Sequence, residues 1–292
     1  MIGFIGLGTM GEPMCRNLAT RGGEEVCAYD IAKAPLERLK GYGVIAVAGI
    51  RELAERCSMV LLSLPGAEEL KRVCAGPGSL MLFLRSGSTV VDLSTSPVTL
   101  TRELHERFSA RGVHFADAPV ARTREAAEKG TLSVMVGANE ATFKRIRPLL
   151  ANIASDITHC GPPGTGQAMK VLNNMVLFQN VLALAEALAV ARASSIDPRL
   201  MLEVLSKGSA DSFALRNHGL KAMLPNEFPE RAFSVDYALK DLGYALELAA
   251  QAKLELTGAR NARALLRKAA AAGHGKQYFP VVAKVIEPAG SL

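Results

Sequence analysis

The chain has 292 residues, of which 49% are hydrophobic and 21% are charged, and this balance is typical of a globular protein with a substantial core. Its net charge is +6, but basic residues are not interleaved with aromatic ones, so we expect small anionic partners and no nucleic acid. The 5 cysteines form no Cys-x-x-Cys pair, which argues against a metal site or a disulfide framework.

Met1 leads directly into an apolar run, without the basic segment and cleavage site of a secretory signal. We therefore expect a cytoplasmic protein with reduced thiols. The best candidate for a membrane span, residues 171–185, is uncharged but interrupted by Asn and Gln, and is shorter than the roughly 20 residues that cross a bilayer. No membrane partner is predicted.

The first predicted strand, residues 2–5, leads into a glycine-rich loop and then into a helix. The loop is a Gly-x-Gly-x-x-Gly pattern, with the sequence Gly6-Leu7-Gly8-Thr9-Met10-Gly11. Gly6 allows a tight turn, Gly8 lets the backbone approach a pyrophosphate, and Gly11 lets helix and strand pack closely. Because the pattern lies between a strand and a helix, these six residues are predicted to bind a dinucleotide.

The second predicted strand ends in Asp30. A carboxylate at this place can accept hydrogen bonds from both ribose hydroxyls of NAD and would repel the 2′-phosphate of NADP. NAD is therefore the predicted cofactor, in preference to NADP. The same aspartate could instead cap the helix that follows.

Strand and helix patterns alternate as far as about residue 161. Continuous apolar runs, such as residues 59–64 and 89–93, indicate strands of a parallel sheet that helices cover on both faces. Ligands of such sheets bind at the carboxyl ends of the strands, where Leu64, Pro65 and Thr95 lie, so these residues are predicted to contact the cofactor. Thr95 could equally cap the next helix.

After residue 161 the strand patterns end and helical periodicity dominates. Helices are predicted at 167–193, 198–206, 211–223, 232–253 and 259–272. The predicted fold is an α/β Rossmann domain with a parallel, doubly wound sheet at residues 1–162, followed by an all-α domain at residues 163–292. The long helix from residue 167 should join the two domains.

That long helix carries Lys170 in its first turns, where a cation opposes the helix dipole. Asn174 lies one turn later, so both side chains leave the same face. The lysine is either catalytic or a surface residue whose stem covers apolar neighbours. In a later helix, Lys240 and Asp241 lie among apolar residues and are compatible with a solvated ion pair or with an active-site role.

Taken together, these features resemble the β-hydroxyacid dehydrogenase family, which includes 3-hydroxyisobutyrate dehydrogenases, tartronate-semialdehyde reductases and sulfolactaldehyde reductases. The resemblance covers essentially the whole chain and rests on the glycine-rich loop and on residues 92–95, 117–120, 130–132, 161–174 and 240–242. It implies an NAD(P)-dependent oxidoreductase that transfers a hydride between nicotinamide and a short 3-hydroxy acid or its semialdehyde. It also implies a homodimer or a homotetramer.

By this resemblance Lys170 is the general acid/base, Asn174 binds the substrate, and Thr95 and Lys240 lie near the nicotinamide. An ammonium beside the reacting oxygen can supply its proton and stabilise a developing alkoxide, so the chemistry agrees. A non-catalytic dinucleotide-binding relative, or an imine reductase, would be expected to lack this lysine.

The segment after Val120 departs from the family pattern. Most members have Ser-Gly-Gly here, whereas this chain has Ala121-Arg122-Thr123. Sulfolactaldehyde reductases carry Gly-Arg-Thr at this place, with the arginine facing the sulfonate, and a guanidinium suits such an anion. Arg122 and Thr123 are therefore predicted to bind the terminal anion of a substrate such as sulfolactaldehyde, succinate semialdehyde or tartronate semialdehyde. The alternative is a 3-hydroxyisobutyrate dehydrogenase proper.

Overall fold

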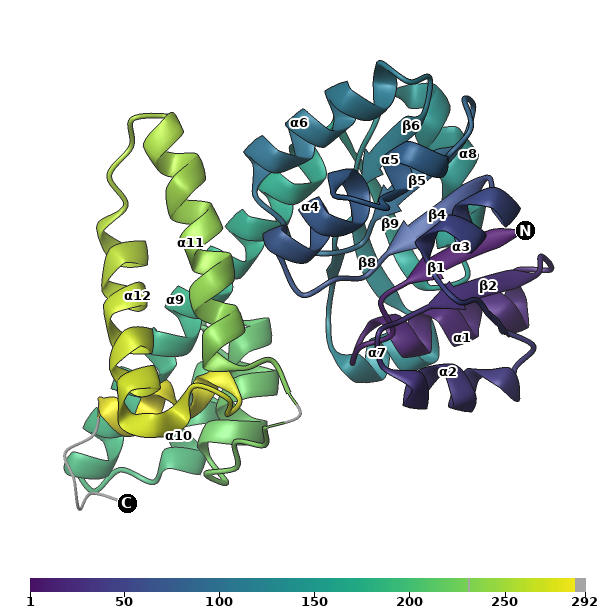
Figure 1. Cartoon of the computed structure of the whole chain (residues 1–292). Coiled ribbons are helices and arrows are strands. Elements are labelled where there is room, and N and C mark those ends of the chain that lie inside the picture. The colour runs from purple at the N-terminus through teal and green to yellow at the C-terminus, as the bar shows by residue number, and fades with distance from the viewer. Residues whose placement is uncertain (231, 287–292) are drawn as a thin grey trace. The chain divides into compact units, whose positions relative to one another are not determined.

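The computed structural model describes residues 1–230 and 232–286 and divides into two compact units, Met1–Lys170 and Val171–Leu292 (Figure 1). The division falls within helix α9 (Thr165–Ala193), a few residues after the boundary that the sequence pattern predicts at residue 162. The helix is continuous, so its first turns belong to the first unit and the remainder to the second.

The first unit is built on a nine-stranded sheet in the order β3-β2-β1-β4-β5-β6-β8-β7, with β9 paired to β8. The mutually parallel strands are β1 (Ile2–Ile5), β2 (Val26–Tyr29), β3 (Ile45–Ala46), β4 (Met59–Leu62), β5 (Thr89–Asp92) and β6 (His114–Asp117). Strand β8 (Leu132–Gly137) is antiparallel to β6 and to β7 (Val120–Ala121), and parallel to β9 (Ala154–Gly161). The predicted parallel, doubly wound sheet is confirmed, while β7 and β9 were not predicted.

Helices cover both faces of this sheet (Figure 1). One face packs against α1 (Gly11–Arg21), α2 (Lys33–Lys40), α7 (Arg124–Lys129) and α8 (Glu140–Leu150), and the other against α3 (Ile50–Arg56), α4 (Ala67–Ala75), α5 (Leu80–Phe83) and α6 (Val98–Ser109). Successive side chains of a strand point to opposite faces. Phe4 of β1 therefore joins the core beneath Met14 and Leu18 of α1, while its neighbour Ile5 joins the core beneath Leu53 of α3.

The second unit is helical throughout the regular elements described in residues 171–230 and 232–286, as predicted. After α9 come α10 (Pro198–Leu205), a π-helical segment η1 (Leu215–Met223), α11 (Val235–Gln251), α12 (Thr257–Ala269), a second π-helical turn η2 (Ala270–His274) and the 3₁₀ segment η3 (Phe279–Val285). Their apolar faces enclose a separate core.

By length and composition alone, α9 is apolar enough to cross a membrane, which the sequence analysis did not predict. A buried core helix meets the same criterion. Phe178, Leu182 and Leu188 of α9 lie in the core of the second unit. Other apolar residues of the same helix, among them Met169, Val176 and Val190, are exposed.

Candidate active site

The glycine-rich loop joins β1 to α1 in a tight turn. Gly6 has a φ of 94°, and a Cβ added to it would lie 2.2 Å from the carbonyl oxygen of Ser63. A Cβ on Gly11 would lie 2.0 Å from the carbonyl oxygen of Gly6, whereas one on Gly8 would meet nothing within 4 Å. The loop is thus closed against the strand and open at Gly8, so the residues present fit a dinucleotide whose pyrophosphate lies at the N-terminus of α1.

Asp30 follows β2 and accepts two backbone hydrogen bonds. The N–H of Leu7 donates to its Oδ2 at 2.5 Å, and the N–H of Ala32 donates to its Oδ1 at 2.7 Å. The first bond fixes the carboxylate beside the glycine-rich loop, and the second holds the chain just before α2, whose N-cap is Ala32 and not Asp30. Binding of the ribose by Asp30 stays a prediction. A carboxylate has about four acceptor positions, which leaves capacity for ribose hydroxyls.

The sheet order places the predicted cofactor residues of the first unit side by side along one edge. Strands β2, β1, β4 and β5 are neighbours in that order and run parallel, so the loops after their carboxyl ends are adjacent. These loops carry Asp30, the glycine-rich motif, Leu64 with Pro65, and Thr95. The N–H of Leu64 donates to Oγ of Ser94 at 2.9 Å and joins the last two loops directly.

Lys170 is the last residue of the first unit, and its side chain is 9% exposed. The start of its helix is held by Asp117 at the end of β6. The N–H of Gly164 donates to Oδ1 of Asp117, and the N–H of Gln167 donates to Oδ2, both at 2.7 Å. Burial, with a smaller effect of the Asp92 carboxylate, raises the pKa of Asp117 to about 7, although these backbone donors oppose the shift. Asp117 lies in one of the motifs that carry the family resemblance but was not among the predicted site residues.

In the second unit, Asn174 and Lys240 are brought together by Asp241. Nδ2 of Asn174 donates to Oδ2 of Asp241 at 2.7 Å, and Nζ of Lys240 lies 3.1 Å from Oδ1. Asp241 is only 1% exposed, so the solvated ion pair that the sequence also allowed is not what is observed. Asp241 was not among the predicted site residues, and the structure places it in contact with two residues that were.

Arg122 lies outside these two clusters. Its guanidinium donates to Oδ2 of Asp156 at 2.7 Å, to Oγ of Ser155 at 2.9 Å and to the carbonyl oxygen of Thr131 at 2.6 Å. Its φ is 87°, a conformation that L-residues rarely adopt. The Ser155 hydroxyl and the Arg122 guanidinium lower the pKa of Asp156. A role in substrate binding stays a prediction and requires this ion pair to open.

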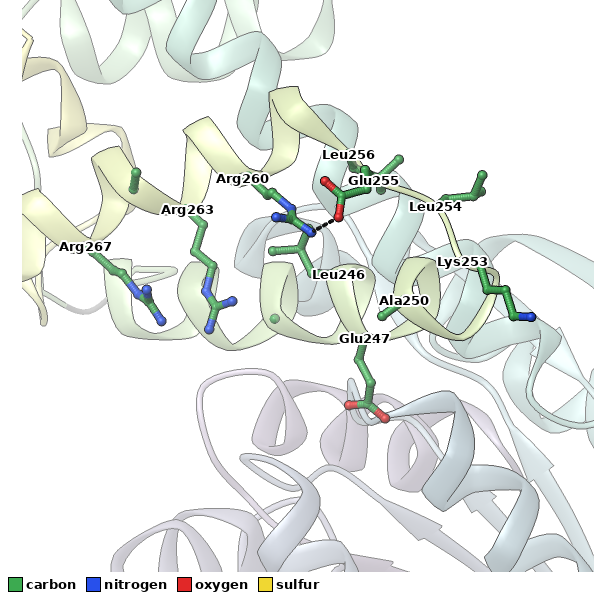
Figure 2. Close-up of a pocket in the computed structure, with 12 residues that line it drawn as sticks. Leu246, Glu247, Ala250, Lys253, Leu254, Glu255, Leu256, Arg260, Arg263 and Arg267 are labelled. Carbon is green, nitrogen blue, oxygen red and sulfur yellow. Dashed lines mark hydrogen bonds and ion pairs between the residues drawn. The ribbon is translucent and has the colours of Figure 1, made fainter.

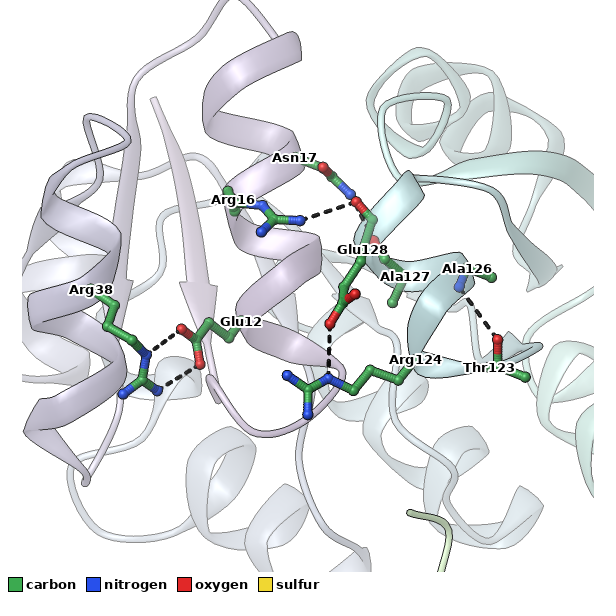
Figure 3. A network of polar contacts seen from close by, with 9 residues as sticks. All are labelled: Glu12, Arg16, Asn17, Arg38, Thr123, Arg124, Ala126, Ala127 and Glu128. Carbon is green, nitrogen blue, oxygen red and sulfur yellow. Dashed lines mark hydrogen bonds and ion pairs between the residues drawn. The ribbon is translucent and has the colours of Figure 1, made fainter. Parts of the chain in front are cut away.

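Thr123 is the N-cap of α7, where its Oγ1 accepts from the N–H of Ala126 at 3.4 Å (Figure 3). The helix is fastened to α1 on its other side. Nδ2 of Asn17 donates to the carbonyl oxygen of Ala127 at 2.7 Å, and Arg16 donates to that of Glu128 at 3.0 Å. The loop that holds Arg122 and Thr123 therefore leads into a well-anchored helix.

Comparison with known proteins identifies the family of this chain. Residues 1–161 match the NAD-binding domain of 6-phosphogluconate dehydrogenase, and residues 164–286 match the NAD-binding domain of NADP-dependent 3-hydroxyisobutyrate dehydrogenase. The chain is 35% identical to 2-(hydroxymethyl)glutarate dehydrogenase of Eubacterium barkeri over 286 residues, which cover 98% of this chain and 94% of that protein. The chain belongs to the β-hydroxyacid dehydrogenase family.

Two further relatives illustrate the similarity. The chain is 31% identical to 2-hydroxy-3-oxopropionate reductase of Escherichia coli, with 98% of this chain and 97% of that protein covered. The solved structure of 3-hydroxyisobutyrate dehydrogenase from Mycobacterium tuberculosis with L-serine superimposes with a TM-score of 0.89, at 31% identity over 98% of this chain and 99% of that chain. This β-hydroxyacid dehydrogenase is accordingly an NAD(P)-dependent oxidoreductase, as the sequence predicted.

The second unit of this β-hydroxyacid dehydrogenase also has a groove between α11 and α12, with a cavity volume of about 700 Å³. Figure 2 shows Arg260, Arg263 and Arg267 along its α12 side, with Arg260 paired to Glu255 at 2.9 Å. Among the described residues that line the groove there are none of those predicted for catalysis or for cofactor binding. The groove is therefore separate from the candidate active site.

Proposed function

We propose that this β-hydroxyacid dehydrogenase uses NAD to interconvert a short 3-hydroxy acid that bears a terminal anion and the corresponding semialdehyde. The observation that carries the proposal is the burial of Lys170, a cation near the capped start of α9. Taking an ammonium out of water is costly, so a buried lysine calls for a function.

The residues of this chain have separate tasks in such a reaction. The glycine-rich loop and Asp30 would hold the nicotinamide dinucleotide, which would supply or accept the hydride when bound. Lys170 moves the proton on the attached oxygen and stabilises negative charge there. Asn174 donates one amide hydrogen to Asp241, and its second amide hydrogen is suited to a substrate oxygen.

The terminal anion of the substrate is assigned to Arg122 and Thr123. The ion pair of Arg122 with Asp156 has side-chain exposures of 40% and 56%. Exposed pairs of this kind contribute only about 0–1 kcal/mol, so a substrate anion can displace Asp156 at small cost. The name 2-(hydroxymethyl)glutarate dehydrogenase supports an anion at the far end of the substrate, because a glutarate carries a second carboxylate there, although this acid is itself branched.

NAD is favoured over NADP by the position of Asp30, whose carboxylate is fixed beside the glycine-rich loop. A 2′-phosphate at this place would meet a like charge. A cytoplasmic location and a homodimeric or homotetrameric assembly complete the proposal.

The second candidate is 3-hydroxyisobutyrate dehydrogenase proper, which the similarity to the Mycobacterium tuberculosis enzyme favours. Its substrate also ends in a carboxylate but carries a methyl branch beside it. Arg122, in place of a small residue, would narrow the space for the branch.

Initial rates of the purified protein, measured with NADH and with NADPH, test these alternatives. The panel is sulfolactaldehyde, tartronate semialdehyde, succinate semialdehyde and branched methylmalonate semialdehyde. We expect NADH and a linear substrate with a terminal sulfonate or carboxylate to have the highest kcat/KM. A preference for methylmalonate semialdehyde would favour the second candidate, and inactivity with every substrate would overturn the proposed chemistry.

A further inference from the structure

Gln167 lies in the first turn of α9 and is fully buried, at 0% exposure. Its Oε1 accepts from the N–H of Ser96 at 3.0 Å, and its Nε2 donates to the carbonyl oxygen of Ser94 at 2.8 Å. Both ends of the amide are therefore used, and together they clamp the two residues on either side of Thr95. The orientation of the amide is fixed, because exchanging its oxygen and nitrogen would break both bonds.

The clamped loop is itself rigid. Oδ1 of Asp92 accepts from the N–H of Ser94 at 2.9 Å, and its Oδ2 accepts from Oγ of Ser96 at 3.2 Å. Nε2 of Gln167 lies 3.5 Å from the same Oδ2. The loop at the end of β5 and the first turn of α9 thus form one buried polar network, in which the position of either element determines the position of the other.

The helix end of this network is equally constrained. Asp117 accepts from the N–H of Gln167 itself, so the backbone of this residue is bound to the end of β6 and its side chain to the loop after β5. Lys170 follows Gln167 by three positions, which places it on the same face of α9 and about 4.5 Å further along the axis. A small rotation or shift of the first turn would therefore move the ammonium of Lys170 directly.

We propose that Gln167 is a positioning residue for the reaction. By bonding Ser94 and Ser96 simultaneously, it sets the place of Lys170 relative to Thr95, whose loop lies on the edge of the sheet that carries the cofactor residues. The inference rests on the proposed function of Lys170. Gln167 itself acts only through the helix and the loop that it joins.

Gln167→Met tests this role, because it retains the length of the side chain and removes both hydrogen bonds. Misplacement of a catalytic group by about 1 Å can cost about 100-fold in rate. We expect kcat to fall about 10- to 100-fold, KM for NADH to stay within about threefold, and the deuterium isotope effect with NADH labelled at the transferred position to increase. Gln251→Met, on the exposed end of α11, is the matched control and should leave all three unchanged.

A double-mutant cycle separates positioning from general stability. In a Lys170→Ala background, Gln167→Met should cause little further loss, because the group that it positions is gone. An equal loss in both backgrounds, or a loss confined to thermal stability and KM, would overturn the inference. Near-normal turnover of Lys170→Ala alone would instead overturn the proposed function.

Gln167→Glu provides a second test that does not depend on how well the methionine variant folds. A protonated glutamic acid can donate to the carbonyl oxygen of Ser94 as the amide does, whereas a carboxylate would be repelled by Asp92 and Asp117. The kcat of this variant relative to the wild type should therefore rise as pH falls from 8 to about 5.5. The new carboxyl group would titrate together with the neighbouring carboxyl of Asp117, so the pH dependence of the ratio reports the charge of the whole network around position 167. A ratio independent of pH would contradict the inference.

Discussion

The amide of Asn174 donates a hydrogen bond of 2.7 Å to Asp241, a carboxylate whose other oxygen lies 3.1 Å from Lys240. Asp241 is nearly inaccessible to solvent. Asp241 is thus the buried centre of a three-residue cluster. The other two members are Asn174, which is predicted to bind the substrate, and Lys240, which is predicted to lie near the cofactor. Since hydrogen bonds to charged groups contribute about 1.5–3 kcal/mol, this carboxylate matters for stability as well as for positioning.

Replacing Asp241 by Asn should lower the free energy of unfolding by about 1–3 kcal/mol, because Lys240 loses its counter-ion in a buried setting. Urea unfolding monitored by circular dichroism measures this change. Asp236→Asn is the matched control on the same helix, since Asp236 pairs with Lys276 at an exposed position and should cost no more than about 1 kcal/mol. Equal losses for the two variants would contradict a buried role for Asp241.

Lys170→Ala should lower kcat by about 10²–10⁴, which is the usual contribution of a general acid/base. Binding of NADH should be retained, because the glycine-rich loop and Asp30 are distant in sequence and belong to other elements. Steady-state rates and fluorescence titration of NADH measure the two quantities. Turnover close to the wild-type value would exclude Lys170 from the chemistry.

Asp30→Ala should narrow the preference for NADH over NADPH, since the repulsion of a 2′-phosphate is removed. The substitution also removes the acceptor of the Leu7 and Ala32 N–H groups, so binding of NADH itself should weaken. The ratio of kcat/KM for the two cofactors is the decisive measurement. An unmodified enzyme that uses NADPH as well as or better than NADH would contradict the assignment.

A buried histidine in the second unit predicts a pH dependence of stability. His218 is bonded through Nδ1 to the hydroxyl of Tyr278, its Nε2 has no hydrogen-bond partner among the described residues, and burial lowers its pKa to about 4 from an ordinary value of 6.5. Between these values the unfolded chain binds a proton that the folded chain does not. Stability should therefore be unaffected above about pH 6.5 and should fall as pH decreases toward 4.

The variant His218→Gln, which does not titrate, isolates this effect. Relative to the variant, the wild type should lose on the order of 2 kcal/mol between pH 7 and pH 4.5, by the linkage of pKa shift to free energy. Thermal unfolding of both proteins at each pH measures the difference. If the free energy of unfolding depends on pH in the same way in both proteins, His218 is not the group that causes the loss of stability.

The sequence predicted those parts of the site that depend on residues close to one another in the chain. The glycine-rich loop and Asp30 follow strands whose apolar character is visible in the sequence, and the parallel arrangement then places their loops along one edge. The network around Gln167 was not visible, because the hydrogen bonds that it accepts from Ser96 and donates to Asp117 join residues 71 and 50 positions apart. Nothing in the sequence around a glutamine tells whether its side chain is buried or exposed.

The missed strand β9 had a further consequence. Its sequence, Ala154–Gly161, alternates polar and apolar residues only weakly, and most of its side chains are exposed or half-buried. It is ordered by pairing with β8, which a pattern in a single segment does not reveal. Asp156, the partner of Arg122, lies on this strand, so the ion pair that holds Arg122 could not be anticipated from the neighbours of Arg122 in sequence.

This ion pair allows a sharp test of Arg122, because Arg122→Gly and Asp156→Asn both break it but only the first removes the guanidinium. If Arg122 binds the terminal anion, Arg122→Gly should cost about 2–5 kcal/mol in kcat/KM for an anionic semialdehyde and much less for an uncharged aldehyde of the same length. Asp156→Asn should preserve or increase kcat/KM, since it removes the carboxylate that competes with the substrate for Arg122.

The free energy of unfolding of Arg122→Gly should differ from the wild type by no more than about 1 kcal/mol, because loss of an exposed ion pair is offset by relief of the positive φ. Equal losses of activity in the two variants, or equal losses on the two substrates, would show that Arg122 only holds the loop before α7 against β9.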